Sequence, residues 1–265
     1  MGSTSPAPLP DPPAVEPPGV TLDHGWATAR GPRSDNQDRA ATTPGWLVVS
    51  DGIGGHAGGA TAASLTVAAV ADVLEGRAHR GAILSAEELV VASVAAANRA
   101  VRAGRRADPT VADMGATIVL AVADGPGAGG SDWKLASVGD SPAWVVSAAG
   151  ATQVTADDNV AGELVRSGTI TPEDAEHHPG RHLLVRAVGL EDDLPVAATT
   201  VHLRPGDALV LASDGLSGVL GPADIHGVLS TAGSMAEATA TLVERSLLAG
   251  TRDNVTVAAV RHLPS

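Results

Sequence analysis

The sequence contains no cysteine, tyrosine or phenylalanine, and these absences exclude several kinds of protein. Without cysteine, the chain can form neither disulfides nor thiolate metal sites, and it has no cysteine nucleophile. Its only aromatic side chains are 4 tryptophans, too few to build a surface that stacks nucleic-acid bases. The core must therefore consist of Val, Leu, Ile and Ala. A chain without cysteine fits a reducing cytoplasm, which is where we expect the protein to act.

Positive charge is also scarce. Lys and Arg number 17 against 30 Asp and Glu, which gives a formal net charge of -13. Such a chain repels a phosphate backbone and an anionic membrane surface, so we expect neither nucleic acid nor membrane among its partners. No apolar run approaches the roughly 20 residues of a membrane helix, and the first cationic residue is Arg30, so the N-terminus lacks the positive start of a signal peptide.

Proline is concentrated at the N-terminus. Residues 1–20 contain seven prolines and almost no apolar periodicity, which predicts an extended, disordered leader. No second proline-rich linker and no repeat follows. The length allows one large domain or two small ones, and the uninterrupted sequence favours one domain over residues 21–263; we expect a monomer.

Short runs rich in β-branched residues alternate with longer alanine-rich stretches of helical spacing. The predicted strands are Gly45–Ser50, Ala116–Ala123, Trp133–Val138, Ala143–Ser147, Val196–Leu203, Ala208–Ser213 and Asn254–Val260. The predicted helices are Gly59–Leu74, Ala86–Arg105, Val160–Ser167 and Ser234–Leu248. Most strands succeed one another without an intervening helix, which indicates an α+β fold instead of a βαβ alternation. Two packed sheets flanked by helices fit this order.

The strongest chemical signal is an apolar strand that ends in Ser-Asp-Gly, and it occurs twice. One run enters Asp51-Gly52 and the other enters Asp214-Gly215. In each, a carboxylate follows a rigid strand, and we expect the glycine to let the backbone turn sharply and expose a carbonyl. Asp140 ends a third apolar run, and Asp253 precedes the last. Oxygen ligands of this kind select magnesium, manganese or calcium over zinc.

Two alternatives compete with a metal site. Any single Asp-Gly pair between strands is commonly only a turn. Four carboxylates at strand ends argue against that reading, because they would repel one another unless a cation held them together. The run Gly52-x-Gly54-x-x-Ala57 also follows a strand as a dinucleotide fingerprint does, but Asp51 would repel a pyrophosphate and no acidic residue ends a second strand at the required distance.

The motifs resemble those of the metal-dependent protein phosphatases, the phosphatase type 2C family, in their bacterial form. Seven segments occur in the order of the family and span nearly the whole chain from Arg30 to Val260. They are Arg33–Asp38, Asp51–His56, Gly115–Thr117, Val138–Ser141, Gly168–Thr171, Ser213–Leu216 and Asp253–Thr256. The resemblance implies a central β-sandwich of two mostly antiparallel sheets with helices on both outer faces, a four-layer αββα fold.

The resemblance also implies a ligand set for two ions, Mn²⁺ or Mg²⁺. Asp51 would bridge them, the carbonyl of Gly52 would bind the second ion, and Asp214 and Asp253 would complete the first. Asp140 corresponds to the residue that bacterial members use with the Asp214 position for a third, weaker ion. A water held between two cations becomes a nucleophile near neutral pH and can attack phosphorus directly.

Three catalytic residues follow from the same resemblance. Arg33 matches the phosphate-binding arginine, Asp38 would orient metal-bound water, and His56 is the nearby candidate for the acid that protonates the leaving oxygen. The sequence departs from the family at Gln37, where many members have Glu. It departs again at Asp157-Asp158-Asn159, where bacterial relatives usually have Asp-His-Ser in a substrate-contacting flap.

The implied function is hydrolysis of phosphoserine and phosphothreonine in proteins, with phosphoproteins and a Ser/Thr kinase or its targets as partners. The alternative is a catalytically silent module of the same fold that binds phosphoproteins or regulates a kinase. Retention of Arg33, Asp51, Asp214 and Asp253 together favours the enzyme.

Overall fold

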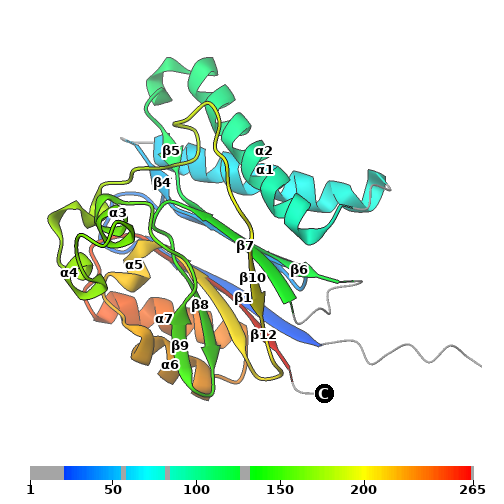
Figure 1. Cartoon of the computed structure of the whole chain (residues 1–265), viewed down its shortest axis with the longest axis vertical. Helices are drawn as coiled ribbons and strands as arrows, with labels where there is room; N and C mark the ends of the chain where they lie inside the picture. The colour runs from blue at the N-terminus through cyan, green and yellow to red at the C-terminus, as the bar shows by residue number, and fades with distance from the viewer. Residues whose placement is uncertain (1–20, 55–57, 81–83, 126–131, 264–265) are drawn as a thin grey trace, which may run out of the picture.

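The computed structural model describes residues 21–54, 58–80, 84–125 and 132–263. The predicted leader, residues 1–20, lies outside them, as does residue 56. Two five-stranded sheets pack face to face at the centre of the molecule, and every strand pair within them is antiparallel (Figure 1). The predicted sandwich of two antiparallel sheets is confirmed.

The first sheet has the strand order β1-β12-β11-β8-β9. Its strands are β1 (Leu22–Ala29), β12 (Val255–His262), β11 (Ala208–Ala212), β8 (Ala143–Ser147) and β9 (Gly150–Gln153). The second sheet has the order β10-β7-β6-β3-β2. Its strands are β10 (Thr199–His202), β7 (Asp132–Val138), β6 (Ile118–Asp124), β3 (Trp46–Ser50) and β2 (Arg39–Thr43).

Helices cover the outer face of each sheet (Figure 1). The long pair α1 (Gly58–Arg80) and α2 (Ala86–Ala107) packs on the second sheet, and α6 (Pro222–Thr231) and α7 (Met235–Leu248) pack on the first. The short helices α3 (Val160–Arg166), α4 (Pro172–Glu176) and α5 (Asp214–Ser217) lie together at one end of the sandwich (Figure 1). None of the described helices is long and apolar enough to cross a membrane.

Alternating side chains divide the interior into three apolar layers. In β3, Leu47 and Val49 point between the sheets, whereas Val48 points toward α1 and α2. In β11, Leu209 and Leu211 point between the sheets, whereas Val210 points toward α6 and α7. Because both faces of the central strands are buried, their sequences are continuous apolar runs instead of alternating ones. This is why they were predictable.

One end of the sandwich collects the carboxylates. Antiparallel pairing brings the end of β3 beside the start of β6, and the end of β11 beside the starts of β12 and β8. Asp51 follows β3, and Asp253 and Asn254 precede β12. A small sheet of β4 (Gly52–Ile53) and β5 (Gly115–Ala116) lies at the same end. Ala116 also pairs with Val188, so the strand partner of Gly52 is itself held by a further segment.

The strand predicted from Val196 begins only at Thr199 in the structure. β10 pairs with the part of β7 from Asp132 to Leu135. The segment that precedes β10 does not pair with β7 and diverges from it. Arg186 donates a hydrogen bond from Nη2 to the carbonyl oxygen of Pro195 at 2.5 Å, which holds the segment away from β7. A pocket lies between this segment and β7, where strand pairing would otherwise continue.

Candidate metal and phosphate site

Asp51 is fixed through its backbone by the strand that lies opposite. The N–H of Asp51 donates to Oγ1 of Thr117 at 2.9 Å, and the N–H of Thr117 donates to the carbonyl oxygen of Asp51 at 2.8 Å. Ser50, the serine of the first Ser-Asp-Gly, donates from Oγ to the carbonyl oxygen of Thr117 at 2.7 Å. These bonds leave the Asp51 carboxylate free to face the other carboxylates.

The two glycines of the Ser-Asp-Gly segments are required by close packing, not by a sharp turn. Neither Gly52 nor Gly215 has a positive φ, so left-handed backbone is not what requires glycine at these positions. A Cβ on Gly52 would lie 2.0 Å from the carbonyl oxygen of Gly59, and a Cβ on Gly215 would lie 1.9 Å from that of Asn254. The sharp turn comes at Gly54, whose φ is 137°. Gly215 lies in the first turn of α5.

The structure places the predicted carboxylates close enough to Asp51 to act on it electrostatically. Burial raises the pKa of Asp51 well above its usual range, and the negative charges of Asp38, Asp214, Asp253 and Asp140 raise it further. The strand ends therefore lie close enough together for these charges to act on Asp51, as the resemblance implies. Like charges gathered in this way cost folding free energy unless protons or a cation neutralise them.

Asp38 lies beneath this group and is almost completely buried, with 2% of its surface exposed. Its Oδ2 accepts a hydrogen bond from Oγ of Ser213 at 2.7 Å, and its Oδ1 has no hydrogen-bond partner among the described residues. Burial raises the pKa of Asp38 to about 6, opposed chiefly by the hydrogen bond from Ser213. A buried carboxylate oxygen without a donor is unusual and indicates that something else binds there.

Asp214 and Asp140 form the far side of the group. Burial and the charge of Asp253 raise the pKa of Asp214, and its Oδ1 is also buried without a partner among the described residues. Burial, with the charges of Asp214 and Asp157, raises the pKa of Asp140 to about 7. A hydrogen bond with Asn159 opposes that rise.

Arg33 lies at the mouth of the site beside Asp253. It donates from Nη2 to Oδ2 of Asp253 at 2.6 Å and from Nε to the carbonyl oxygen of Arg252 at 3.0 Å. Both side chains border a cavity of about 380 Å³ that reaches Asp51 and Gly52. The predicted phosphate-binding arginine thus shares one opening with three of the predicted ligands, Asp51, Gly52 and Asp253.

The chemistry of the donors fits a divalent cation, although the side chains do not form a complete coordination sphere in this structure. Within the described ranges, no three His, Asp or Glu side chains are placed so that they could hold a metal ion together. One reason is visible: Asp253 is turned to Arg33. The two partnerless oxygens of Asp38 and Asp214, and the carboxylates that raise the pKa of Asp51, nevertheless provide the oxygen-only donors that hard cations prefer.

Several supporting residues were not assigned by the sequence reasoning. Ser213 links Asp38 to β12, because its Oγ also accepts from the N–H of Thr256 at 3.0 Å. Asn254 donates from Nδ2 to the carbonyl oxygens of Arg30 and Asp35 and accepts from the N–H of Gln37, which ties the Arg33 loop to β12. His182 is close enough for its charge to lower the pKa of Asp214. Ser213 and Asn254 both lie within motif segments that resemble the phosphatase family, and this position in the sequence is what could have identified them.

The predicted leaving-group acid, His56, lies outside the described residues. Arg33, Asp38, Asp51, Gly52, Asp140, Asp214 and Asp253 all lie at the same end of the sandwich.

The sequence profile of the protein phosphatase 2C family matches residues 29–249. The chain therefore belongs to the protein phosphatase 2C family.

Relatives and solved structures agree with this membership. The serine/threonine protein phosphatase PstP of Mycobacterium tuberculosis is 35% identical over 225 residues, which are 85% of this chain and 42% of the relative. The chain thus spans less than half the length of that relative. Protein phosphatase PhpP of Streptococcus pneumoniae is 30% identical over 248 residues, with 86% of this chain and 92% of the relative covered.

The fold is that of the solved bacterial phosphatases. The crystal structure of Mycobacterium tuberculosis PstP/Ppp superposes with a TM-score of 0.81 at 32% identity, over 92% of this chain and 99% of that one. The catalytic domain of PstP in complex with two manganese ions gives a TM-score of 0.78 at 30% identity, over 92% and 100%.

Proposed function

We propose that this chain is a metal-dependent protein serine/threonine phosphatase that hydrolyses phosphoserine and phosphothreonine, and that residues 21–263 form its single catalytic domain. The observation that carries the proposal is the group of buried aspartates around Asp51, beside an arginine at the mouth of the same cavity. Family membership and the names of the relatives support it.

Asp51, Asp214, Asp253 and the carbonyl of Gly52 are the proposed ligands of two divalent ions, Mn²⁺ or Mg²⁺. Asp140 would hold a third together with Asp214. Bound cations would supply a nucleophilic water and neutralise charge on the phosphoryl oxygens. The manganese-bound structure of PstP supports this choice of metal. Asp253 would have to leave Arg33 to become a ligand, and that exchange would free the guanidinium for substrate.

The remaining residues orient what the cations activate. Asp38, held by Ser213 below the group, would accept a hydrogen bond from a water and fix its direction. Arg33 is half exposed, so its planar guanidinium can bind two phosphoryl oxygens and align phosphorus for in-line attack. His56 remains the proposed acid for the leaving oxygen.

The first experiment is hydrolysis of p-nitrophenyl phosphate and of a phosphothreonine peptide by the purified protein, with Mn²⁺, with Mg²⁺ and with EDTA. We expect phosphate release that requires the metal and disappears in EDTA. If no turnover occurs with either metal, the alternative of a silent phosphoprotein-binding module takes its place.

Arg33→Ala should raise KM for the phosphothreonine peptide about tenfold to a hundredfold and change kcat less. A charge-assisted hydrogen-bonded pair is worth about 1.5–3 kcal/mol, which corresponds to that range. Arg33→Lys should recover only part of the loss, because an ammonium lacks the two-pronged geometry. Steady-state kinetics of the three proteins test this, and an unchanged KM in Arg33→Ala would rule out the assigned role.

The partners and location belong to the same proposal. Phosphorylated proteins are the proposed substrates, with a Ser/Thr kinase or its targets among the partners. The chain would act as a monomer in the cytoplasm, a place supported by the absence of cysteine. Net negative charge argues against nucleic acid.

A further inference from the structure

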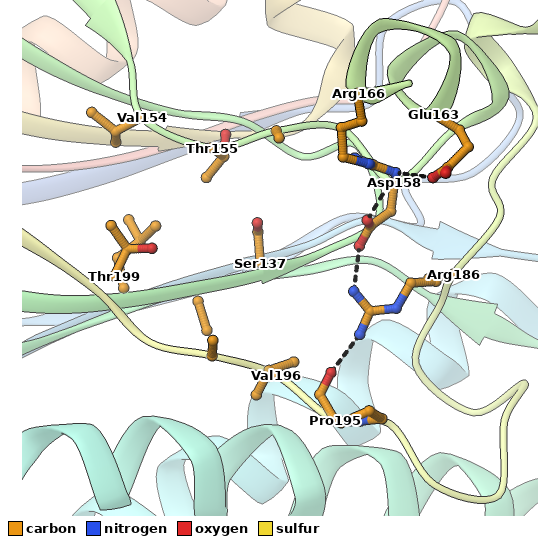
Figure 2. A pocket seen from close by; sticks show the side chains of 14 residues that line it. Ser137, Val154, Thr155, Asp158, Glu163, Arg166, Arg186, Pro195, Val196 and Thr199 are labelled. Carbon is orange, nitrogen blue, oxygen red and sulfur yellow. Dashed lines mark hydrogen bonds and ion pairs between the residues drawn. The ribbon is translucent and has the colours of Figure 1, made fainter. Parts of the chain in front are cut away.

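Behind the carboxylate group, a second cavity opens beside the flap segment that departs from the family pattern. It has a volume of about 500 Å³ and lies between β7, the segment before α3 and the segment that diverges from β7 before β10. Figure 2 shows Asp158 at one end of it, with Arg166 on one side and Arg186 on the other. Asp158 is the residue found where relatives usually have His.

Asp158 is a buried carboxylate with two cationic partners. Only 7% of the residue is exposed. Its Oδ2 accepts from Nη1 of Arg186 at 3.1 Å, and its Oδ1 lies 3.6 Å from Nη2 of Arg166. Each arginine is itself fixed, Arg186 on the carbonyl oxygen of Pro195 and Arg166 on that of Asp157. Charge in such a place is stable only while these partners remain.

Asp158 also holds the backbone before Asp140, once through its own backbone and once through its carboxylate. The N–H of Asp158 donates to the carbonyl oxygen of Gly139 at 2.9 Å, and the N–H of Gly139 faces Oδ2 of Asp158 at 3.4 Å. Gly139 has a φ of 98°, and a Cβ there would lie 2.7 Å from Cγ2 of Thr117. Only glycine tolerates this conformation and contact, so a side chain at position 139 would displace the backbone before Asp140.

The next residue along the flap acts on Asp140 directly. Asn159 lies within reach of the Asp140 carboxylate and opposes the rise in its pKa, while its Oδ1 accepts from the N–H of Gly162 at 2.8 Å and caps α3. Asp158 therefore holds the backbone that precedes Asp140, and Asn159 lies beside the Asp140 carboxylate. The positions of Asp158 and Asn159 depend on the position of the flap, and Arg166 and Arg186 fix the flap through Asp158.

We infer that Asp158, clamped by Arg166 and Arg186, is a positioning residue for Asp140 and for the cation that Asp140 would share with Asp214. The inference rests on the proposed function, since it concerns one of the proposed metal ligands. Two arginines hold the carboxylate at position 158, so its charge is partnered where it lies.

The test is a calorimetric titration of Mn²⁺ into metal-free protein, which reads binding without activity. Asp140→Asn should remove the weakest binding event and so identify it. Asp158→Asn should shift that event to about tenfold higher Mn²⁺ concentration, as loss of a supporting residue commonly does, and leave the tighter events unchanged. Asp192→Asn is the matched control, because it breaks another Arg–Asp pair, with Arg102, on an exposed loop.

The outcomes separate this inference from the proposed function. Wild-type affinity for the weakest event in Asp158→Asn, or no event that depends on Asp140, overturns the inference. Absence of any Mn²⁺ binding in the wild type overturns the metal assignment itself. Thermal unfolding shows whether Asp158→Asn folds. If it does not, Arg186→Gln and Arg186→Lys replace it in the titration. We then expect Arg186→Gln to shift the weakest Mn²⁺ binding event further than Arg186→Lys.

Discussion

Asp51→Asn should lower kcat/KM about a thousandfold or more and leave the fold intact. Asp51 is the carboxylate on which the charges of Asp38, Asp140, Asp214 and Asp253 converge, so it is the proposed bridge between two cations. Losing a bridging charge would remove several kcal/mol of transition-state stabilisation, and each 1.36 kcal/mol corresponds to tenfold in rate, which yields about three orders of magnitude. The variant keeps the backbone bonds to Thr117, because these use only main-chain atoms of residue 51.

The measurement is steady-state hydrolysis of the phosphothreonine peptide at saturating Mn²⁺, with circular dichroism on the same samples. Asp72→Asn is the control, since that aspartate is exposed on α1 away from the site and should retain wild-type rates. Wild-type turnover by Asp51→Asn would exclude the metal assignment. A variant that fails to fold would instead assign the carboxylate to stability.

The strands whose predicted bounds agree best with the structure are buried on both faces. β6 and β11 are unbroken apolar runs because one face packs between the sheets and the other under helices. β1 was missed because its side chains are mostly half-buried and Gly25 interrupts it. A Cβ on Gly25 would lie 2.5 Å from the backbone nitrogen of Ala236, so the glycine is explained by contact with α7, which no local pattern reveals.

The candidate site was predictable where function fixes a residue type at a strand end. Asp51, Asp214 and Asp253 could be selected because apolar strands lead to or from them. The support of Asp38 by Ser213 could not, because the two residues are 175 positions apart and serine is common at such a place. The clamp on Asp158 was hidden for the same reason, since Arg186 lies 28 positions away and its guanidinium reaches back across the flap.

Without metal, the protein should lose stability as pH rises from about 4 to about 7. The folded state binds protons at the aspartates more tightly than the unfolded chain, because the pKa of Asp38 rises from 3.8 to about 6 and that of Asp140 to about 7. A raised folded-state pKa contributes stability that is complete below the unfolded value and is lost as pH rises through the folded value. For Asp38 alone, a shift of about two pKa units corresponds to about 3 kcal/mol.

Urea unfolding in EDTA at pH 5 and pH 7.5 tests this, with Asp51→Asn as the comparison. That variant lacks the carboxylate at the centre of the group, so its free energy of unfolding should fall less with pH and should exceed that of the wild type at pH 7.5. Added Mn²⁺ should reverse the order, because a cation that binds only the folded wild type stabilises it. An equal pH dependence of the free energy of unfolding in both proteins would mean that the buried aspartates are neutralised in another way. The negative charge of Asp51 would then neither destabilise the metal-free protein nor attract the cation.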